Sequence, residues 1–566
     1  LVGSEMCIRD SAGTTQEGKI MKRKAVAAVL TAVMVASMFT GCGSDNGSSS
    51  AKSASAASAA SAANDTVDED GKVNGIMYQE GLPLVDEGDY TFSIFCDDSS
   101  ESGEFIMLDE FKKQTNVDVD LKIYPYETAT ERLNLDLNSG DYADVIGGWT
   151  LSDNAILTYG VNQGVFIPLE DYFEKYCPNI SAILDLPGVR EKMTAPDGHI
   201  YTIPYVCADT TVGYSPYINT KWLENVGMSM PTTTDEFEAV LKAFKEQDAN
   251  GNGDASDEIP FSTDPNNKHI EAMAGYFGLP MNKLGIAIQN EKVVYGGVSD
   301  TYREFLSWFH KLYAEGLVDV ELYTQDSSTW EGKGNQDLYG VSIAYGSNEF
   351  TGIPAAEERG DFDSMPVLNT DKDGIWLRDT EGFSVYRTQA VITNKAEHPE
   401  IICRWFDNAF ALENGIGCNR GPVGVIVNKE DDGYHAIDTT TLSEEDQEKY
   451  SWGNLWPQSL PKYLPVDFEF VEEHPMYDEK KATEEAYEAN LTKEIIPSYW
   501  IDLDKIDTFS DTNTAIKDFF EQQQAQFVCG ELDIDNDADW QAYVDGMYSL
   551  GLEDWVATQG IEEIAK

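Results

Sequence analysis

The segment from residue 90 to 149 alternates between two hydrophobic periodicities, and this alternation limits the possible folds more than any other feature of the chain. Residues 90–96 (YTFSIFC) and 117–126 place apolar side chains at alternating positions, which predicts β-strands, while residues 102–116 between them show helical spacing. A second helix then leads to an apolar strand at residues 143–146. This succession predicts an α/β fold, in which a parallel sheet carries helices on its faces.

Parallel sheets bind their ligands beyond the carboxyl ends of the strands. Trp149 follows the third predicted strand at that position, after Gly147 and Gly148. Farther along, Ser299 or Asp300 is expected to cap a helix that ends at Gly316, and another helix is expected at residues 511–527. No period of 20–50 residues repeats, which excludes solenoids and propellers.

The chain is long enough for two or three large lobes, because 566 residues exceed the roughly 100–200 of one domain. Its 100 acidic and 39 basic residues give a net charge of −61. So negative a surface repels phosphate backbones and anionic lipids, which argues against nucleic acid or a membrane surface as the ligand. A neutral or cationic small molecule remains open.

The first 41 residues combine extra upstream sequence with a targeting signal, and they are not expected to belong to the fold. Residues 1–20 resemble translated upstream or adapter sequence, and Met21 begins a secretory signal with three basic residues and an apolar run at residues 25–39. That run is shorter than the roughly 20 residues that span a bilayer. Gly41-Cys42 is similar to a lipobox, so we expect residues 21–41 to be a lipoprotein signal peptide and Cys42 to carry the lipid. An ordinary secretory signal is the alternative.

Residues 42–84 are expected to form a lipid-anchored flexible linker. Residues 43–72 are rich in Ser, Ala, Gly and Asp and contain only one bulky apolar side chain, Val67, so they cannot form a core. Acyl chains, including palmitate, would hold the protein on the extracellular face of the cell membrane. The membrane contact is then through the anchor alone.

Nucleophile, redox and zinc motifs are missing from the sequence. The six cysteines beyond Cys7 and Cys42 contain no CxxC pair, and buried free thiols are expected. HExxH, P-loop and GxSxG patterns do not occur, and the six histidines are isolated. A binding protein without catalytic residues is therefore expected. A secreted glycoside hydrolase stays open as an alternative, because any two carboxylates could form an acid/base pair. A peptide-binding or sensor lipoprotein is the third possibility.

Residues 248–260 (DANGNGDASDEIP) have the spacing of a calcium-binding loop. Oxygen-bearing side chains occupy positions 1, 3 and 5, and a glycine at position 6 permits the sharp turn. Position 12 is Ile259, so the acids at positions 10 and 11 would close the coordination shell in place of the usual glutamate. Pro260 predicts an extended segment after the loop, and a polar turn without metal is the alternative. The predicted ligands of a structural Ca²⁺ are Asp248, Asn250, Asn252, Asp254 (through its backbone carbonyl), Asp257 and Glu258.

Several segments together resemble the extracellular solute-binding proteins, family 1, which serve ABC sugar importers, and they occur in the order found in that family. The loop followed by Asp-Glu-Ile-Pro is especially similar to alginate-oligosaccharide-binding members and their Gram-positive lipoprotein relatives. The resembling segments lie at residues 133–146, 195–205, 217–245, 248–260, 311–319 and 392–400.

The resemblance implies a two-lobe periplasmic-binding-protein (type II) fold that closes on a sugar at its hinge. It implies a monomeric substrate-binding lipoprotein that captures a sugar or oligosaccharide and delivers it to ABC permease subunits. The calcium loop would belong to the second lobe. The expected boundaries are residues 85–206 plus 382–470 for the first lobe and 207–381 plus 471–566 for the second.

Sugar rings stack on aromatic side chains and present hydroxyls to polar ones. By analogy with the family, aromatic residues after strands, at lobe crossings and in irregular segments are the candidates, with an ordinary packing role as the alternative for each. The two Trp of the irregular, proline-containing stretch near residue 455 are expected to be exposed. The candidate sugar-binding residues are Trp149, Asp153, Tyr205, Tyr345, Asn348, Trp376, Trp452 and Trp456.

Overall fold

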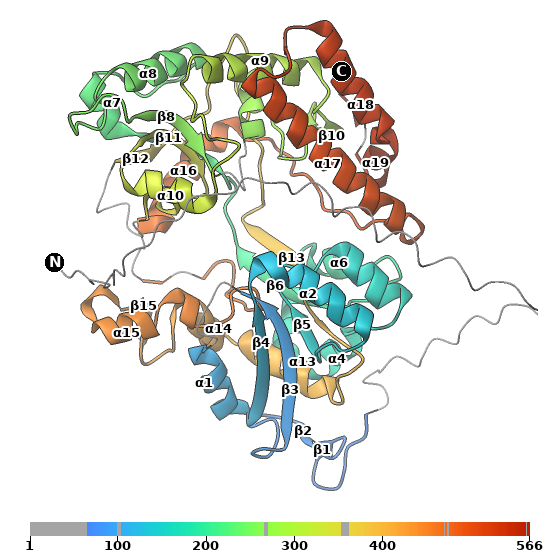
Figure 1. The fold of residues 1–566 in the computed structure, drawn as a ribbon. Helices are drawn as coiled ribbons and strands as arrows, with labels where there is room; N and C mark the ends of the chain where they lie inside the picture. The colour runs from blue at the N-terminus through green and yellow to red at the C-terminus, as the bar shows by residue number, and fades with distance from the viewer. Residues whose placement is uncertain are drawn as a thin grey trace, which may run out of the picture. The chain divides into compact units, whose positions relative to one another are not determined.

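The structure is a computed structural model that describes residues 65–98, 104–264, 270–352, 361–437, 439–468, 470–471, 475–561 and 563–565. Residues 56–566 form one compact unit. Its helices and strands surround two main hydrophobic cores, one for each lobe (Figure 1). The signal peptide, Cys42 and most of the predicted linker lie outside the described residues.

The first lobe is built on a five-stranded sheet of order β4-β3-β5-β13-β6. The predicted parallel arrangement is confirmed for the first three strands of this order. β13 runs antiparallel to both of its neighbours, so the sheet is mixed and not purely parallel. The strands are β3 (Tyr90–Asp97), β4 (Val117–Tyr124), β5 (Val145–Gly147), β6 (Thr202–Ala208) and β13 (Phe383–Ile392).

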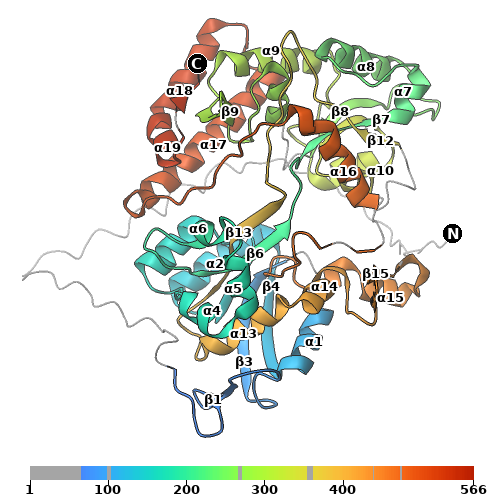
Figure 2. The ribbon, with the colours of Figure 1, turned by 180° about the vertical axis from the view of Figure 1, so that it is seen from behind.

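Alternating side chains of this sheet enter two different cores. In β3, Ile94 and Cys96 belong to the larger core, whereas Phe95 between them belongs to a smaller one on the other face. Figure 2 shows α4, α5 and α13 on the side of the larger core. The helical segments are α1 (Ile106–Thr115), α2 (Tyr126–Ser139), α3 (Asp153–Ala155), the π-helical η2 (Ile156–Asn162), α4 (Glu170–Tyr176), α5 (Pro178–Leu184), α6 (Val189–Met193), α13 (Pro399–Ala409) and α14 (Leu412–Arg420).

The second lobe is built on a four-stranded sheet of order β12-β7-β11-β8. Its large core lies under α8 and α9, and a smaller cluster lies under α10 and α11. The strands are β7 (Ser215–Asn219), β8 (Ile259–Thr263), β11 (Tyr339–Ala344) and β12 (Phe362–Ser364), and the helices are α7 (Thr220–Val226), α8 (Thr234–Glu246), η3 (Ile270–Phe277), α9 (Asp300–Ala314), α10 (Ser327–Asn335) and α11 (Asn348–Thr351).

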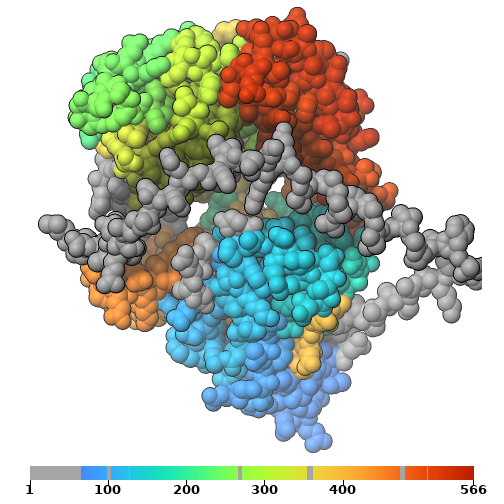
Figure 3. Space-filling model, in the orientation of Figure 1, coloured from blue at the N-terminus to red at the C-terminus, as the bar shows by residue number. Residues whose placement is uncertain are grey.

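The helix predicted to begin at Ser299 or Asp300 and the helix predicted at residues 511–527 are both confirmed. The Ser299 hydroxyl accepts a hydrogen bond from the Tyr302 amide at 3.2 Å and caps α9, as its sequence suggests. The C-terminal helix α17 (Ile506–Cys529) packs against α9, and Figure 3 shows the red and yellow-green surfaces in contact. These C-terminal elements are α16 (Pro475–Tyr487), η6 (Glu488–Asn490), η7 (Leu503–Lys505), α17 (Ile506–Cys529), α18 (Asp537–Ser549) and α19 (Leu552–Thr558), with β16 (Glu563–Ile564) completing a small sheet with β9 (Ile286–Gln289) and β10 (Lys292–Tyr295).

Residues 65–84 do not behave as a linker. Val73, Met77 and Leu84 are buried in the first-lobe core, and the short strands β1 (Lys72–Val73) and β2 (Met77–Tyr78) pair with each other. The expectation that the linker reaches residue 84 is therefore wrong. A few apolar side chains in this otherwise polar segment attach it to the first-lobe core, whose other residues come from distant parts of the chain.

An irregular region completes the first lobe between α14 and α16. It contains a β-hairpin and two short helical segments, and its end lies along the carboxyl edge of the first sheet: the Ser459 hydroxyl donates to the Asp97 carbonyl, and the Gln458 amide donates to the Asp98 carboxylate at 2.7 Å. The elements are β14 (Val427–Glu430), β15 (Gly433–Ala436), η4 (Thr439–Thr441), α15 (Glu444–Lys449) and η5 (Trp452–Asn454).

Candidate ligand-binding site

A cavity of about 570 Å³ lies where the chain passes between the two sheets. Its wall includes the end of β6 and the segment leading to β7, the residue after β11, the segment leading into β13, and part of β13 itself. Its lining residues are Cys207, Ala208, Asp209, Thr210, Gly213, Tyr214, Ala272, Met281, Asn282, Lys283, Leu284, Tyr345, Trp376, Leu377, Asp379, Thr380 and Tyr386.

Trp149 stands at the carboxyl end of β5 and is 46% exposed. The Asp97 carboxylate fixes the turn that presents it, because it accepts the Trp149 amide at 2.9 Å and the Thr150 amide at 2.6 Å. Gly148 has φ +137°, and a Cβ there would lie 2.3 Å from the Asp97 carboxylate oxygen. The turn therefore requires glycine and holds the indole away from the core.

Tyr386 joins Trp149 and Tyr205 in one aromatic group. The Tyr386 ring meets Trp149 edge-on at 5.3 Å and stacks on Tyr205 at 5.4 Å. Only Tyr386 of the three lines the cavity, so the group extends from the cavity to the exposed indole. The prediction did not include Tyr386, because its position depends on the antiparallel pairing of β13 with β6, which no local pattern reveals.

Tyr345 contributes the ring of the second lobe. It follows β11 directly, lines the cavity, and donates its hydroxyl to the Asp209 carboxylate at 3.4 Å. The Lys480 ammonium lies 3.8 Å from the centre of the Tyr345 ring. Asn348, predicted from the same turn, begins α11 and is not among the residues that line the cavity.

Two carboxylates face the cavity, and sequence reasoning missed both. Asp209 accepts hydrogen bonds from the Ser384 hydroxyl at 2.5 Å and from the Thr210 amide at 2.8 Å. Asp379 accepts the Gly213 amide at 2.7 Å. Desolvation in the cavity wall raises the pKa of Asp379 to about 6, and the neighbouring Asp209 charge adds to the rise.

Lys480 is the buried cation beside these groups. It is 5% exposed and donates to the Gly213 carbonyl at 2.8 Å. Burial lowers its pKa to about 8, although the surrounding carboxylates, first among them Glu479, oppose that shift. Lys480 lies on α16, far along the chain from the rest of the cavity, so no local pattern predicts its position there.

Asp153 has a partner other than a ligand. Its two carboxylate oxygens accept from the Arg387 guanidinium at 2.8 and 2.5 Å. The same guanidinium lies 4.1 Å from the centre of the Trp500 ring and donates to the Tyr499 carbonyl. Asp153 therefore orients Arg387, and its role as a sugar ligand stays a prediction.

The three other tryptophans predicted to bind sugar, besides Trp149, differ in their exposure to solvent. Trp452 is 58% exposed, as expected. Trp456 is fully buried, so its expected exposure is wrong: it stacks on Trp405 at 5.7 Å, and its segment covers the first-lobe core. Trp376 is 1% exposed between Tyr276 and Tyr487, and it lines the cavity.

The predicted calcium loop connects α8 to β8, which confirms the extended segment after it. Gly253 has φ +95°, and its amide donates to Asp248 at 2.9 Å. The Asn252 amide group donates to Asp257 at 2.8 Å. The Asp254 carboxylate accepts from the Ser256 hydroxyl at 2.6 Å, and coordination of a metal through the Asp254 backbone carbonyl stays a prediction.

Glu258 provides the test of whether these residues suit a cation. Its Oε1 accepts the Ala249 amide at 2.9 Å, whereas its Oε2 is buried without a hydrogen-bond partner. Desolvation raises the pKa of Glu258, although backbone amides, among them that of Ala249, oppose the rise. An all-oxygen donor set with an orphaned carboxylate oxygen fits Ca²⁺.

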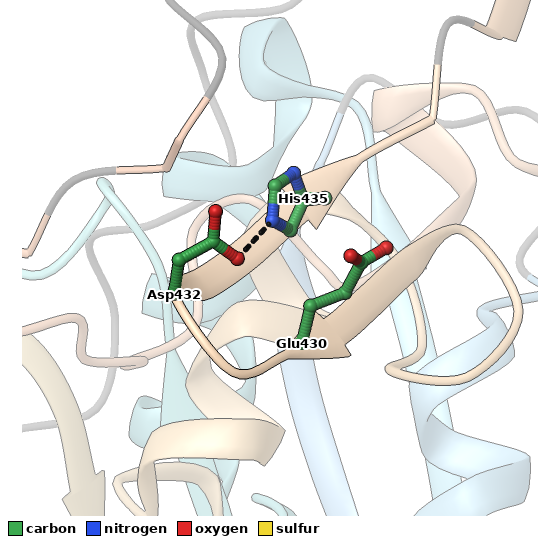
Figure 4. Close-up of side chains that lie close together, drawn as sticks. All are labelled: Glu430, Asp432 and His435. Carbon is green, nitrogen blue, oxygen red and sulfur yellow. Dashed lines mark hydrogen bonds and ion pairs between the residues drawn. The ribbon is translucent and has the colours of Figure 1, made fainter.

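One other group of potential ligands occurs in the described part of the chain. Glu430, Asp432 and His435 lie on the β14–β15 hairpin with ligand atoms within 4.8 Å of one another (Figure 4). The His435 ring pairs with Asp432 at 2.9 Å, and both carboxylates are exposed. This arrangement is an exposed ion pair on a hairpin far from the cavity wall.

The six cysteines within the described residues are free, as expected, but the expected burial is wrong for Cys529, which is exposed, and for Cys207, which is only partly buried. Cys207 lines the cavity, and desolvation raises its pKa to about 12, so its thiol is not a nucleophile at neutral pH. Among the described helices, none is both long and apolar enough to cross a membrane.

A sequence profile described as bacterial extracellular solute-binding protein matches residues 98–415. The fructooligosaccharide ABC transporter substrate-binding protein FusA of Streptococcus pneumoniae is 31% identical over 411 residues, which cover 70% of each chain. The polygalacturonan/rhamnogalacturonan-binding protein YtcQ of Bacillus subtilis is 27% identical over 146 residues, covering 26% of this chain and 28% of that one.

Several solved structures of solute-binding proteins have a fold similar to that of this chain. FusA of S. pneumoniae in complex with kestose has a TM-score of 0.72 and 27% identity, covering 83% of this chain and 98% of the other. An EF-hand mutant of FusA in complex with fructo-nystose has a TM-score of 0.71 at the same identity and coverage. The alginate-binding protein AlgQ2 without calcium ion has a TM-score of 0.67 at 22% identity, covering 85% and 99%.

Proposed function

Because this chain belongs to the bacterial extracellular solute-binding protein family, we propose that its cavity binds an oligosaccharide outside the cell for delivery to an ABC permease. The observation that carries the proposal is the cavity itself. Aromatic rings and carboxylates meet there, at the segments that join the two lobes.

The cavity offers the two kinds of contact that a sugar needs. Tyr345 and Tyr386 present ring surfaces to the apolar C–H faces of sugar rings, and Trp149 extends this surface beyond the cavity. Asp209 and Asp379 supply hydrogen-bond acceptors for hydroxyls. The volume of about 570 Å³ lies within the range of small-molecule sites and suits a short oligosaccharide.

A fructooligosaccharide is the first candidate ligand. The relative that is 31% identical to this chain carries that substrate class in its name, and the solved structures at 27% identity contain kestose and fructo-nystose. Titration with fructooligosaccharides of different linkage and length measures which of them the cavity prefers.

The proposed mechanism is a two-state hinge. The segments around residues 209–214 and 377–382 join β6 to β7 and lead back into β13, so they are the parts of the chain that a rotation of the lobes would bend. A sugar that contacts both lobes favours the closed form by the contacts it gains only there. The expected lobe boundaries, residues 85–206 plus 382–470 and 207–381 plus 471–566, place these segments at the hinge.

The loop at residues 248–258 would hold a structural Ca²⁺. The ion would tie the end of α8 to the start of β8 through oxygen ligands. Asp248, Asp257 and Glu258 supply the charges, and an EF-hand named in a related structure supports this assignment. The loop lines no part of the cavity, so the ion would stabilise the second lobe without touching the sugar.

Cys42 would carry the lipid that keeps the protein on the extracellular face of the membrane, with palmitate among its acyl chains. The signal-like sequence of residues 21–41 supports this proposal. Mass spectrometry of the membrane fraction should find the N-terminal peptide beginning at a diacylglyceryl-modified Cys42. A peptide that begins elsewhere and carries no lipid would contradict the anchor.

The proposed function is tested by thermal-shift screening against neutral and acidic oligosaccharides, followed by chromatography of the recovered sugar. The proposal expects a concentration-dependent rise in melting temperature with an unaltered sugar. Cleaved products would instead favour the glycoside hydrolase. The absence of any shift with every carbohydrate would contradict sugar binding.

A further inference from the structure

We propose that the cavity selects uncharged oligosaccharides and rejects those that carry uronate carboxylates. The inference rests on the proposed function, because it concerns the ligand class of the same cavity. Its starting point is the distribution of charged groups around the cavity wall.

The carboxylates of the wall are available to a ligand. An ionised carboxylate offers about four acceptor positions, and the Asp379 side chain uses one of them, for the Gly213 amide. Asp209 accepts from Ser384 and Tyr345, which aim it along the wall. Both groups can therefore accept hydrogen bonds from sugar hydroxyls but repel a ligand carboxylate.

The nearest buried cation does not cancel these charges. The Lys480 ammonium donates to the Gly213 carbonyl and lies over the Tyr345 ring. It also attracts Asp209 and Asp379, but its single positive charge faces both of these carboxylates. Its other charged neighbours are Glu479 and Glu349, which leave the region with an excess of negative charge. Lys283 also lines the cavity with an exposed side chain, and together with Lys480 it is outnumbered by the four carboxylates Asp209, Asp379, Glu479 and Glu349.

The first-lobe side adds to the excess. Asp97 and Asp98 stand at the carboxyl end of β3, where each accepts backbone amides. Lys462 is the opposing group there: it is 3% exposed, and no described residue accepts a hydrogen bond from its ammonium, which lies 5.6 Å from the centre of the Trp452 ring. Lys462 is outside the cavity lining, and the carboxylate that acts on its charge is Asp98.

A field of one sign inside a concave wall acts more strongly than the same charges on an open surface. This field does not repel an uncharged sugar, and the hydroxyls of that sugar donate hydrogen bonds to the same carboxylates. A uronate must bring its charge against them, and a chain with a net charge of −61 supplies no long-range compensation. The relative YtcQ is named for binding polygalacturonan, which is a polyuronate. The cavity of the present chain should disfavour this class of ligand.

The test compares two trisaccharides of equal length, kestose and trigalacturonate, by titration calorimetry of the full protein at pH 7.5 in low salt. The expected result is saturable kestose binding and trigalacturonate binding at least 100-fold weaker. Raising the salt to 0.5 M should narrow the difference, because screening weakens the repulsion but leaves the contacts to neutral hydroxyls.

Variants locate the selectivity. Asp379→Asn keeps an oxygen for the Gly213 amide and removes the charge, so trigalacturonate binding should strengthen about tenfold while kestose affinity changes less. The matched control is Asp363→Asn, because Asp363 is exposed on β12 of the same lobe and outside the cavity lining. It should leave both affinities unchanged, and an equal gain in Asp363→Asn would overturn the assignment to the cavity.

The outcomes separate this inference from the proposed function. Trigalacturonate binding within tenfold of kestose, or tighter, would overturn the selectivity but leave carbohydrate binding intact. If trigalacturonate binds and the Lys462→Met substitution abolishes that binding, Lys462 recognises the carboxylate of the sugar and the inference is wrong. If neither sugar nor any other neutral or acidic oligosaccharide binds, the proposed function fails, and the inference fails with it.

Discussion

Asp97 and Trp149 show how a buried carboxylate can prepare an exposed ring. The carboxylate holds two consecutive amides after β5, and Gly148 leaves the room it needs. The indole then stands clear of the core, supported from one side by the edge of Tyr386. A ring fixed in this way loses little side-chain entropy when a sugar stacks on it, which favours binding.

Replacing Trp149 by alanine should therefore weaken oligosaccharide binding by about 1–3 kcal/mol, the range for losing an aromatic contact and its buried area. Titration calorimetry measures the effect. Tyr548→Ala is a suitable control, because Tyr548 is a similarly exposed ring on α18, away from the cavity lining. Equal affinities for the Trp149 variant and the unmodified protein would remove this residue from the site.

Asp407 gives a prediction for the dependence of stability on pH. It is 6% exposed, and burial raises its pKa to about 6, although the Ile180 amide and Asn179 oppose the shift. The folded protein therefore binds this proton more tightly than the unfolded chain, whose carboxyl has an ordinary pKa near 4. The resulting stabilisation is present below about pH 4 and is lost as the pH rises through 6.

Urea unfolding at several pH values checks this. Between pH 4 and 7, the free energy of unfolding of Asp407→Asn should fall by about 2–3 kcal/mol less than that of the unmodified protein. Asp379, which titrates near the same pH, is unchanged in both proteins, so the difference isolates Asp407. Parallel pH profiles for the two proteins would contradict the assignment.

At the scale of elements, the α8–β8 connection depends on a polar loop whose acids lie close together. Its backbone turns at Gly251 and Gly253 let the side chains converge, and the buried Oε2 of Glu258 lacks a partner. A bound cation would supply that partner, so the loop should order on binding.

Calcium at 100 times its dissociation constant should then raise the free energy of unfolding by about 3 kcal/mol. Thermal denaturation with calcium and with a chelator measures the difference. Asp248→Ala and Glu258→Gln should abolish it, whereas Asp254→Asn should retain it, because that side chain accepts from Ser256. Calcium stabilisation that survives in Glu258→Gln would contradict the ligand set.

Local patterns predicted these elements well. Alternation along β3 and β4, the Ser299 cap of α9 and the glycine positions of the loop are all properties of adjacent residues, and each was predicted correctly. The insertion of β13 into the first sheet, the burial of Trp456 and the docking of Lys480 beside Tyr345 depend on contacts between residues far apart in the chain. One sequence carries no signal for such contacts, so most of the cavity wall could not be predicted.

For the whole molecule, the segment between η6 and η7 is a further link between the two lobes. Leu491 and Ile496 pack against the second-lobe core, whereas Trp500 packs against the smaller first-lobe core. The Trp500 ring nitrogen donates to the Lys192 carbonyl at 3.1 Å. This link is separate from the segments that line the cavity.

Trp500→Ala should release this link while leaving the cavity lining unchanged. Hydrogen exchange of the amides at residues 497–502 should become faster, and the free energy of unfolding should fall by about 1–3 kcal/mol, as for other partly buried aromatic residues. Trp452→Ala is a control of the same chemical type at a more exposed position. Unchanged exchange at residues 497–502 would show that the link does not order the segment.

Capture of an oligosaccharide and its release unaltered define the proposed function of this two-lobed protein. Isothermal titration calorimetry of the purified protein with kestose tests it most directly, because binding and turnover give different heat signals. The account predicts discrete injection heats that saturate at one sugar per protein and return to baseline. A sustained heat of hydrolysis, or no heat with kestose or any other oligosaccharide, would contradict it.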